Sequence, residues 1–306
     1  MEIGFVFPGQ GAQRVGMGKE ICQQYKEAAE VFARADEALG YQMSTICFEG
    51  PQEKLDKTCI TQPALLTTSI ALVKVLEAHG LEPDLTAGLS LGEYTALVAA
   101  SALDFEDAVR LVEYRGSLMQ TAVPPGEGAM AAIIGLNDLV IAGVCAGYEG
   151  IVDVANYNCP GQVVISGETE AVTSVSAILR QEGGKVIPLK VSVPSHCRLM
   201  EKAAGKLEER LNQVNWRQPT VGVVSNVNAR ENSSSDYKEL LVHQLYSPVK
   251  WEQSVRYMMD RVDCLLEVGP GGVLSGFIKK IDRTRWLGQV EDCRSLDGVL
   301  KKMEEL

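Results

Sequence analysis

Hydrophobic residues along the chain form short continuous runs that are separated by longer stretches of mixed polarity. The runs occupy residues 3–7, 85–87, 220–226 and 264–268, and proline and glycine follow the first and the last. A short apolar run that ends at turn residues is typical of a strand buried on both faces of a parallel sheet. The pattern therefore predicts that buried strands recur along the whole chain.

Apolar residues recur every three or four positions between these runs, which is the spacing of one helix face. The stretches predicted to be helical are residues 19–39, 63–79, 92–100, 104–118 and 237–246. Gly80 follows the second stretch in the position of a C-cap, and Asp104 precedes the fourth as an N-cap. Strands that alternate with helices in this way predict an α/β fold with a largely parallel sheet.

The middle of the chain has a different order of elements, starting where the composition changes near Pro124-Pro125-Gly126. The pattern predicts strands at 128–135, 151–155, 162–166 and 185–191, and helices at 137–146 and 170–181. The order β-α-β-β-α-β is typical of a ferredoxin-like fold. We therefore expect a small ferredoxin-like α+β subdomain at residues 125–193, inserted into a large domain of residues 1–124 and 194–306. Residues 156–161 are interpreted as the turn between its middle strands, facing the cleft between the domains.

Composition and charge narrow the range of partners. Hydrophobic residues make up 46% of the 306 residues, enough for a sizeable core. The net charge of −11 argues against nucleic acid as a partner, because phosphate binding needs a basic surface. The chain starts without a basic leader, and no apolar run approaches the ~20 residues that span a bilayer. These features predict a cytoplasmic protein without membrane contact.

Neither a metal nor a cofactor is expected. The eight cysteines are scattered without a Cys-x-x-Cys pair, which fits reduced thiols better than a zinc site or a disulfide framework. The glycine spacings of dinucleotide-binding and P-loop motifs do not occur in the sequence. A dinucleotide or nucleotide phosphate site therefore has no support from the sequence.

The stretch Gly88-Leu89-Ser90-Leu91-Gly92 lies between a predicted strand and a predicted helix. Small residues on both sides of a serine allow a sharp strand-to-helix turn that exposes the hydroxyl, as in a nucleophile elbow. Backbone N–H groups at the start of the new helix would then face an oxygen bound there. The alternative is a Gly-Ser turn that only caps the helix.

A serine nucleophile needs a base to take its proton, and the chain has three histidines. His79 lies in the last turn of a predicted helix, where a favourable interaction with the helix dipole explains its position. His243 lies on a polar helix face. His196 lies in a proline-bounded loop that returns from the small subdomain to the large domain, where active-site clefts form. By elimination His196 is the predicted base; the alternative is a core histidine that the backbone satisfies.

Two further polar residues occupy informative positions. Gln10 follows the first predicted strand, at the sheet edge where open α/β folds bind ligands, although a plain turn explains it too. Arg115 lies on the apolar stripe of residues 108–119, so its guanidinium points toward the core and needs an anion. The pattern leaves open a snorkelling arginine, a pair with Glu93 or Glu113, and a ligand carboxylate.

Six short motifs resemble those of the malonyl-CoA:acyl carrier protein transacylase family. They are Phe7-Pro8-Gly9-Gln10-Gly11-Ala12-Gln13, Gly88-Leu89-Ser90-Leu91-Gly92-Glu93-Tyr94, Tyr114-Arg115-Gly116, Asn158-Cys159-Pro160-Gly161-Gln162, Val193-Pro194-Ser195-His196-Cys197 and Gln244-Leu245-Tyr246-Ser247-Pro248-Val249. Six separated motifs in one order are far more specific than any one of them. The resemblance implies an α/β-hydrolase-like large domain with a ferredoxin-like small one, which agrees with the elements predicted above.

The resemblance also implies an activity. It implies ping-pong transfer of a malonyl group from malonyl-CoA to acyl carrier protein through an ester of Ser90, in fatty acid synthesis. His196 would act as general base and then general acid, and the backbone carbonyl of Gln244 would orient its ring. The backbone amides of Leu91 and Gln10 would hold the tetrahedral oxyanion.

Arg115 becomes, by the same resemblance, the clamp for the malonyl carboxylate. A bidentate guanidinium–carboxylate pair would select a diacid over acetyl, which leaves the buried charge unpaired. One position departs from the family, which usually has histidine before the nucleophile where this chain has Leu89. Activity is expected to survive with altered packing around the elbow, because that side chain is not assigned the proton transfer.

Other activities and the partners remain to be distinguished. A trans-acting polyketide acyltransferase would use the same motifs. A serine thioesterase or esterase would use the same elbow and histidine, but it predicts an acidic partner for the histidine and no carboxylate clamp. Lys279, Lys280 and Arg283 are the predicted docking residues for an acidic carrier protein, and we expect the protein to be a monomer.

Overall fold

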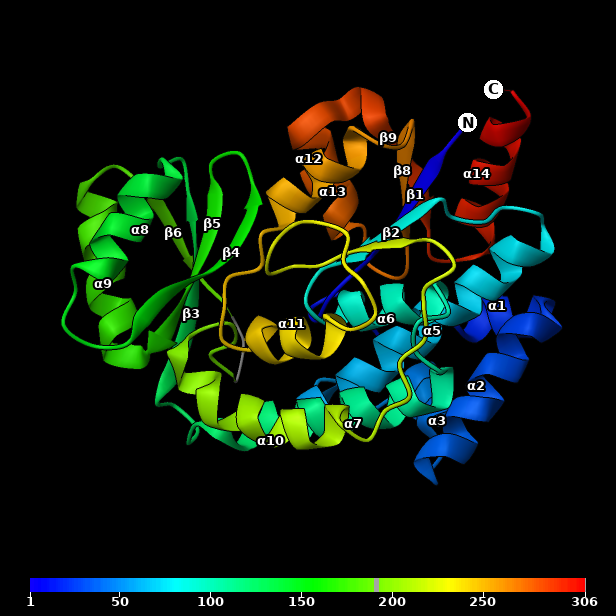
Figure 1. The fold of residues 1–306 in the computed structure, drawn as a ribbon, viewed down its shortest axis with the longest axis horizontal. Coiled ribbons are helices and arrows are strands. Elements are labelled where there is room, and N and C mark those ends of the chain that lie inside the picture. The colour runs from blue at the N-terminus through cyan, green and yellow to red at the C-terminus, as the bar shows by residue number, and fades with distance from the viewer. Residues whose placement is uncertain (190–192, 306) are drawn as a thin grey trace.

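The computed structural model describes residues 1–189 and 193–305 and contains two sheets (Figure 1). The larger sheet has the strand order β7-β2-β1-β8-β9. Its strands are β1 (Ile3–Phe7), β2 (Leu85–Gly88), β7 (Gly222–Val224), β8 (Cys264–Val268) and β9 (Trp286–Val290). All neighbouring strands run parallel, so the predicted α/β fold with a parallel sheet is confirmed.

Helices cover both faces of this sheet. Phe5 and Phe7 of β1 belong to one core and Val6 to another, because successive strand residues point to opposite faces. The first core is covered by α1 (Lys19–Gln24), α2 (Lys26–Leu39), α3 (Met43–Glu49), α4 (Gln52–Leu55), α5 (Thr58–Ala78), α6 (Leu91–Ala99), α7 (Phe105–Ala122), α10 (Glu201–Leu211), α11 (Tyr237–Gln244) and α14 (Cys293–Glu304). The second is covered by α12 (Trp251–Met259) and α13 (Val273–Asp282). Burial on both faces explains the continuous apolar sequence of the central strands.

The smaller sheet is antiparallel and has the order β4-β5-β3-β6. It consists of β3 (Gly128–Ile134), β4 (Val152–Cys159), β5 (Gln162–Glu168) and β6 (Lys185–Pro188). One face packs on α8 (Asp138–Ala146) and α9 (Thr169–Gln181). The other face carries a small apolar cluster of Met130, Ala132, Ala155 and Val164. Figure 1 shows this unit beside the large sheet, with its two helices on the far side.

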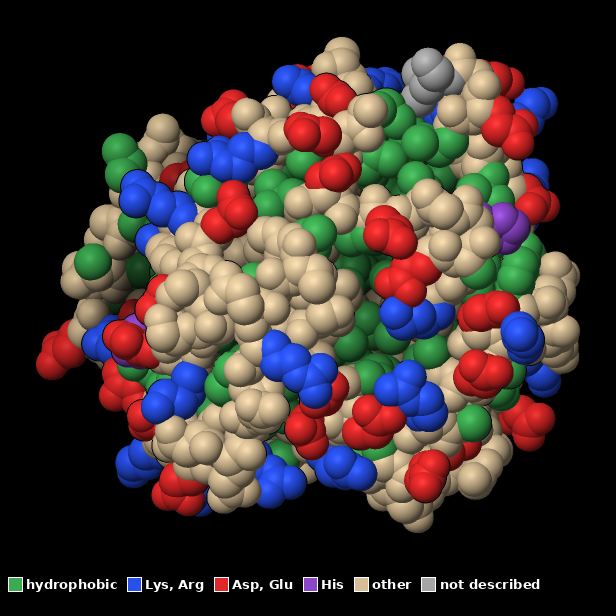
Figure 2. Space-filling view, turned by 45° about the vertical axis from the view of Figure 1, so that its right-hand side comes forward, with side chains coloured by type: hydrophobic (Ala, Val, Ile, Leu, Met, Phe, Trp, Pro, Cys, Tyr) green, Lys and Arg blue, Asp and Glu red, His purple; other side chains and the backbone are tan. Residues whose placement is uncertain are grey.

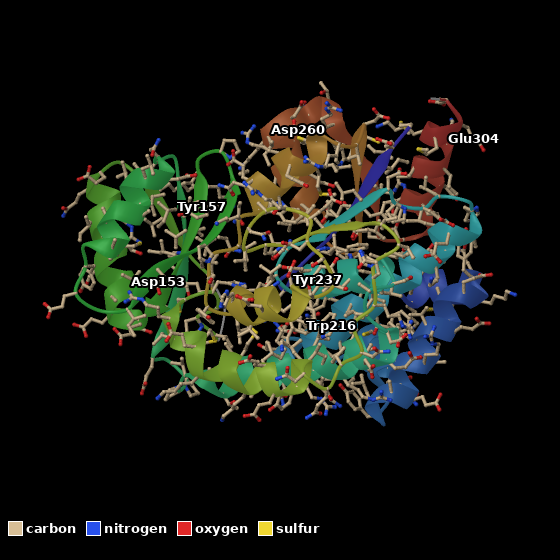
Figure 3. All side chains as sticks on the ribbon, in the orientation of Figure 1. Asp153, Tyr157, Trp216, Tyr237, Asp260 and Glu304 are labelled. Atoms are coloured by element: carbon tan, nitrogen blue, oxygen red, sulfur yellow. The ribbon has the colours of Figure 1, made fainter. Side chains whose placement is uncertain are left out.

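Strand β4 attaches the small sheet to the rest of the chain. The backbone N–H of Val249 donates to the Ala155 carbonyl at 2.8 Å, and the Tyr157 N–H donates to the Val249 carbonyl at 2.9 Å. Arg198, just before α10, forms an ion pair with Asp153 of β4 at 3.0 Å. Asp153 and Tyr157 lie along the same strand in Figure 3. These contacts fix the distance between the two sheets.

Helix α11 is held by aromatic packing. The rings of Trp216 and Tyr237 lie 6.2 Å apart between centroids, and the Trp216 indole N–H donates to the Leu211 carbonyl at 3.2 Å (Figure 3). Tyr237, Leu241 and Gln244 are the buried residues of α11. Gln244 therefore lies on the buried side of the helix.

Several helix boundaries differ from the sequence prediction. Residues 19–39 form two helices, because Tyr25 between α1 and α2 has an extended backbone. Helix α5 begins at Thr58 instead of Pro63, which lies inside the helix. Proline removes one helical hydrogen bond, and the tight burial of α5 on its neighbours compensates for that loss.

Two predictions about strands were wrong. Residues 156–159, taken as part of a turn, belong to β4, and the turn to β5 is formed by Pro160 and Gly161, whose φ is 70°. Residues 264–268 are not the last strand, because β9 and α14 follow them. The β9 sequence WLGQV has too few apolar residues to be recognised as a strand from the sequence. As an edge strand it has a neighbour on one side only, and it therefore needs fewer apolar residues than a central strand. Residues 190 and 191, predicted to end the last strand of the small sheet, lie outside the described residues.

Helix α5 also corrects the expectation that no segment is long and apolar enough to cross a bilayer. By length and composition alone, its 21 residues meet that description, and 83% of its most apolar window is buried inside the protein. It packs against α2, α6 and α7. Such burial is typical of a central core helix.

Candidate active site

A cavity of about 410 Å³ lies at the carboxyl edge of the large sheet. Gln10 lines it from the end of β1, Ser90 and Leu91 from the end of β2, and Arg115 from α7. His196 lines it from the segment that precedes α10. Met130, Asn156 and Leu189 line it from the small sheet and the segment after it. The cavity thus brings together residues that are up to 186 positions apart, from Gln10 to His196.

Ser90 forms the predicted elbow between β2 and α6. Its φ is 55°, in the left-handed region that residues other than glycine rarely adopt. Gly88 and Gly92 make the turn possible, because a Cβ at Gly88 would overlap the Gly92 backbone and one at Gly92 would overlap the Phe7 carbonyl. The strand-turn-helix context that distinguishes an elbow from an ordinary cap is therefore present.

Ser90 and His196 are hydrogen-bonded, and Gln244 orients the histidine. The Ser90 Oγ lies 2.8 Å from His196 Nε2, and His196 Nδ1 lies 2.7 Å from the Gln244 backbone carbonyl. Because a carbonyl only accepts, Nδ1 must carry the proton, which leaves Nε2 free to accept one from Ser90. The geometry therefore suits a base that acts on Ser90.

The environment of His196 favours its neutral form. The side chain is 3% exposed, and burial lowers its pKa from 6.5 to about 4, with a further lowering by the charge of Arg115. The bond to the Gln244 carbonyl opposes this shift. A neutral imidazole can accept a proton, so at neutral pH the histidine is in the form a general base needs.

Arg115 is buried in the cavity wall, as its helical stripe predicted, with 1% exposure. Its Nη1 donates to Gln62 Oε1 at 2.9 Å, and its Nη2 donates to Gln244 Oε1 at 2.9 Å and to Ser90 Oγ at 3.1 Å. All these acceptors are neutral, and Nε has no hydrogen-bond partner within residues 1–189 and 193–305. The guanidinium is thus a buried cation that faces the nucleophile and still has donor capacity.

The amides proposed for an oxyanion flank the nucleophile. Leu91 is the first residue of α6, so its N–H is one of those that an α-helix leaves without an internal partner. Gln10 lies in the turn after β1, and its side-chain Nε2 lies 3.4 Å from Thr58 Oγ1. Both residues line the same cavity as Ser90. Leu89, the atypical residue of the motif, packs against Gly9 next to Gln10.

Two polar residues of the site, Gln62 and Asn226, were not found from the sequence, and Glu93 was considered only as a partner of Arg115. Asn226 Oδ1 accepts from the Ser90 N–H at 2.7 Å, and Asn226 Nδ2 donates to the Gly88 carbonyl at 2.7 Å. Glu93 Oε2 accepts from Gln244 Nε2 at 2.7 Å. The position of Asn226 after an apolar run was the only available signal, because strand ends in a parallel sheet point to the ligand edge.

The basic residues predicted to dock a carrier protein lie on and after α13. Lys279 Nζ lies 3.5 Å from the centroid of the Trp286 ring, and Lys280 Nζ donates to Gln162 Oε1 at 3.1 Å. Arg283 begins a short 3-10 turn after the helix. Acidic and basic side chains are interspersed over the face shown in Figure 2. Docking at these three residues therefore stays a prediction.

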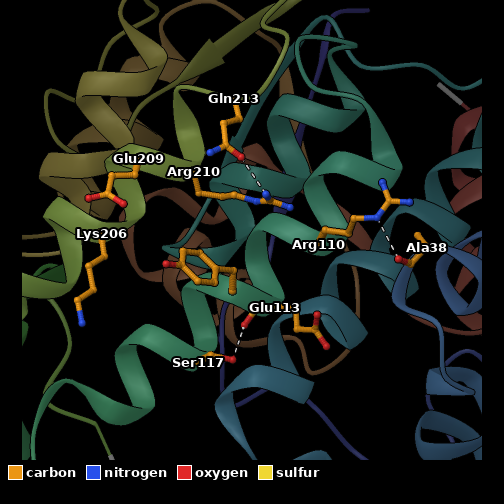
Figure 4. Close-up of a pocket in the computed structure, with 9 residues that line it drawn as sticks. Ala38, Arg110, Glu113, Ser117, Lys206, Glu209, Arg210 and Gln213 are labelled. Carbon is orange, nitrogen blue, oxygen red and sulfur yellow. Dashed lines mark hydrogen bonds between the residues drawn. The ribbon is translucent and has the colours of Figure 1, made fainter.

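A second hollow, of about 500 Å³, lies among α2, α7 and α10 (Figure 4). Arg110 Nε donates to the Ala38 carbonyl at 3.0 Å, and Arg210 Nη1 donates to Gln213 Oε1 at 2.9 Å. Among the residues that the structure describes, those lining this hollow include neither histidine nor cysteine. The described residues that line it thus offer no serine–histidine pair such as the one at Ser90.

Comparisons with known proteins agree with this geometry. The acyl transferase domain family matches residues 4–292. The malonyl CoA-acyl carrier protein transacylase of Escherichia coli (strain K12) is 51% identical over 286 residues, covering 92% of this chain and 93% of its own. The protein of the same name from Bacillus subtilis (strain 168) is 46% identical over 310 residues, covering 99% of this chain and 98% of its own.

Solved structures give the same picture. The malonyl CoA-acyl carrier protein transacylase from Clostridium perfringens has a TM-score of 0.97 and 42% identity, covering 100% of this chain and 98% of its own. A malonyl-transacylase solved in complex with its type II PKS acyl-carrier protein has a TM-score of 0.95 and 44% identity, covering 98% of this chain and 99% of its own.

Proposed function

The chain belongs to the acyl transferase domain family, and on that basis we infer that it transfers a malonyl group from malonyl-CoA to acyl carrier protein. The activity would supply fatty acid synthesis. The observation that carries this inference is the hydrogen-bonded pair of Ser90 and His196 beside the buried cation of Arg115. A nucleophile with its base suits acyl transfer, and a buried guanidinium suits an acyl group with a free carboxylate.

In the first half-reaction, His196 Nε2 takes the Ser90 proton while Oγ attacks the thioester carbonyl carbon. The carbonyl oxygen becomes an oxyanion, which the N–H groups of Leu91 and Gln10 stabilise at roughly 3 kcal/mol each by analogy with other oxyanion holes. The intermediate then collapses, the C–S bond breaks, and His196 returns the proton to the departing thiolate of CoA. The product is a malonyl ester of Ser90.

The second half-reaction repeats these steps with a new nucleophile. The phosphopantetheine thiol of acyl carrier protein gives its proton to His196 and attacks the ester. Collapse of the second intermediate breaks the bond to Ser90 Oγ, which regains its proton from His196. Such a cycle is ping-pong, since CoA leaves before the carrier protein reacts.

Arg115 would bind the malonyl carboxylate. Its Nη2 donates to Ser90 Oγ at 3.1 Å, so the guanidinium lies beside the oxygen that would carry the acyl group, and its Nε has no hydrogen-bond partner among the described residues. A charge-assisted bidentate pair there favours malonyl over acetyl, because acetyl would leave the guanidinium without an anion.

The finer description of the fold is part of the same proposal. We assign residues 1–124 and 194–306 to an α/β-hydrolase-like domain and residues 125–193 to a ferredoxin-like subdomain. The parallel order of the large sheet and the antiparallel order β4-β5-β3-β6, with two helices on one face, support these assignments. A cytoplasmic location is proposed with them, supported by the burial of α5.

The alternatives differ in their support. A role in polyketide synthesis draws support from the 44% identical malonyl-transacylase whose solved complex contains a type II PKS acyl-carrier protein. A thioesterase or esterase is disfavoured, because His196 Nδ1 meets the Gln244 carbonyl instead of a carboxylate and Arg115 lies at the nucleophile.

The test is covalent labelling. Incubation with malonyl-CoA should add one malonyl group by intact mass, peptide mapping should place it on Ser90, and holo-acyl carrier protein should remove it. The Ser90→Ala protein is the control. Failure to label Ser90, or equal labelling by acetyl-CoA, would rule out the malonyl assignment.

A further inference from the structure

Glu93 is a buried acid beside the nucleophile that the transfer steps above do not use. It lies in the first turn of α6 and is 2% exposed. Its Oε2 accepts from Gln244 Nε2 at 2.7 Å and from the Asn226 backbone N–H at 3.0 Å. Burial raises the pKa of Glu93, while these hydrogen bonds and the charge of Arg115 oppose the rise. A buried acceptor that binds two donors in this way fixes the elements that carry them.

Gln244 is the residue through which Glu93 reaches the site. Its Nε2 donates to Glu93 and to the Ser90 carbonyl, at 2.7 Å and 3.0 Å. Its Oε1 accepts from Arg115 Nη2 at 2.9 Å. An amide has one accepting and one donating end, so an acceptor on one side and a cation on the other select a single orientation.

We propose that Glu93 is a positioning residue for acyl-group selectivity, because it holds Gln244 with Oε1 toward Arg115. In this orientation Gln62 and Gln244 each accept from one terminal nitrogen of the guanidinium. If Gln244 turned over, its NH₂ group would face Arg115, and the guanidinium would lose that acceptor and shift. Malonyl loading depends on the guanidinium and acetyl loading does not, so the loss would fall on malonyl.

Two substitutions separate the position of the acceptor from its charge. Glu93→Gln keeps the length of the side chain and an oxygen that accepts both bonds, but it removes the charge. Glu93→Asp keeps the charge and withdraws the oxygen by one methylene. We expect Glu93→Asp to lower kcat/KM for malonyl-CoA relative to acetyl-CoA by about 10-fold, the effect of one hydrogen bond to a charged group. Glu93→Gln should keep the wild-type ratio.

Glu267 provides a matched control. It is also fully buried, and it accepts from the backbone N–H groups of Leu274 and Ser275 at 3.2 Å and 2.6 Å, away from Gln244 and Arg115. Glu267→Asp should leave the malonyl-to-acetyl ratio unchanged even where it lowers the melting temperature. A change of the ratio in this control would show that any buried acid affects selectivity, and it would overturn the proposal.

A double substitution tests whether Glu93 acts through Gln244. Gln244→Ala keeps the backbone carbonyl that orients His196 and removes the amide, so adding Glu93→Asp to it should change the ratio no further. Independent effects would overturn the proposal, as would equal losses of malonyl and acetyl loading in Glu93→Asp, or Glu93→Gln behaving like Glu93→Asp. The inference rests on the proposed function, whose own test is labelling of Ser90 in the unmodified protein, so the two can fail separately.

Discussion

The two sheets line the same cavity with different kinds of residue. The edge of the large sheet contributes Ser90, Leu91 and Gln10, the proposed nucleophile and oxyanion donors, and helix α7 adds Arg115. The small sheet contributes Met130, from an apolar cluster, and Asn156. Parallel strands end in turns and helix N-termini with free N–H groups, whereas an antiparallel ladder uses its backbone groups internally. The large sheet is thus suited to the chemistry and the small sheet to the shape of the acyl group.

The two regions also differ in how they are held. At the edge of the large sheet, the Asn226 side chain accepts from the Ser90 backbone N–H at 2.7 Å, and Arg115 donates to Ser90 Oγ at 3.1 Å. The cleft face of the small sheet is held by apolar packing of small and flexible side chains. Substitutions in the first region should therefore affect the rate and the recognition of the malonyl carboxylate, and those in the second should affect the size of the acyl group that fits.

The largest effect is expected from Ser90→Ala. Without Oγ no ester forms, and malonyl transfer should fall by roughly 10⁴-fold or more, as for other catalytic serines. Quenched-flow transfer assays with holo-acyl carrier protein would measure the loss. The melting temperature should stay near that of the unmodified protein, since Ser90 is only part-buried. Substantial remaining transfer would mean that another nucleophile carries the reaction.

Arg115→Ala should have the next largest effect, and one that depends on the acyl group. Loss of a charge-assisted pair should lower malonyl loading by about 100-fold, while acetyl loading changes far less. Arg115→Lys is the control, because it keeps the charge without the bidentate geometry and should fall in between. Parallel loss of both acyl groups would make Arg115 structural instead.

The rate of malonyl loading should begin to fall at a pH well below the pKa of an ordinary histidine. Only neutral His196 can act as base, and burial lowers its pKa from 6.5 to about 4, so the rate should stay level at neutral pH and fall only below about pH 5. Stability should decline with acidification between pH 6.5 and 4, because in that range only the unfolded chain takes up the proton. Loading rates in buffers from pH 4 to 8 would check this, and a limb near 6.5 would contradict it.

The sequence predicted the region of the chemistry better than the hydrogen bonds that hold it. The elbow, His196 and the inward direction of Arg115 followed from local rules, because a turn between glycines and a helical stripe depend on neighbouring residues. Asn226 and Glu93 contact Ser90 and Gln244 across 136 and 151 positions, and no local pattern marks such pairs. Gln244 was assigned its role only through resemblance.

The errors in the fold have the same origin. The elements of the small sheet were predicted in the right order, since each has its own apolar pattern. Strand β9 was missed because its sequence becomes a strand only by pairing with β8. Strand β4 was predicted too short because pairing with β5 extends it past Ala155 to Cys159. Tertiary contacts override local propensity at sheet edges, where the sequence is least informative.

The smallest effect is expected on the small sheet, from Met130→Ala. Met130 is 7% exposed and lines the cavity, so its truncation should enlarge the space beside an acyl group on Ser90. A pocket that gains room for a methyl group changes discrimination by only about 10-fold, so methylmalonyl loading should rise relative to malonyl by that order. Competition between the two CoA esters, followed by mass measurement of the acyl-enzyme, gives the ratio directly. Leu139→Ala, on the exposed side of α8, is the control and should leave it unchanged. Met130→Ala could instead slow the loading of malonyl and methylmalonyl groups equally. The small sheet would then affect the rate as the large sheet does, and the division of roles between the two sheets would not hold.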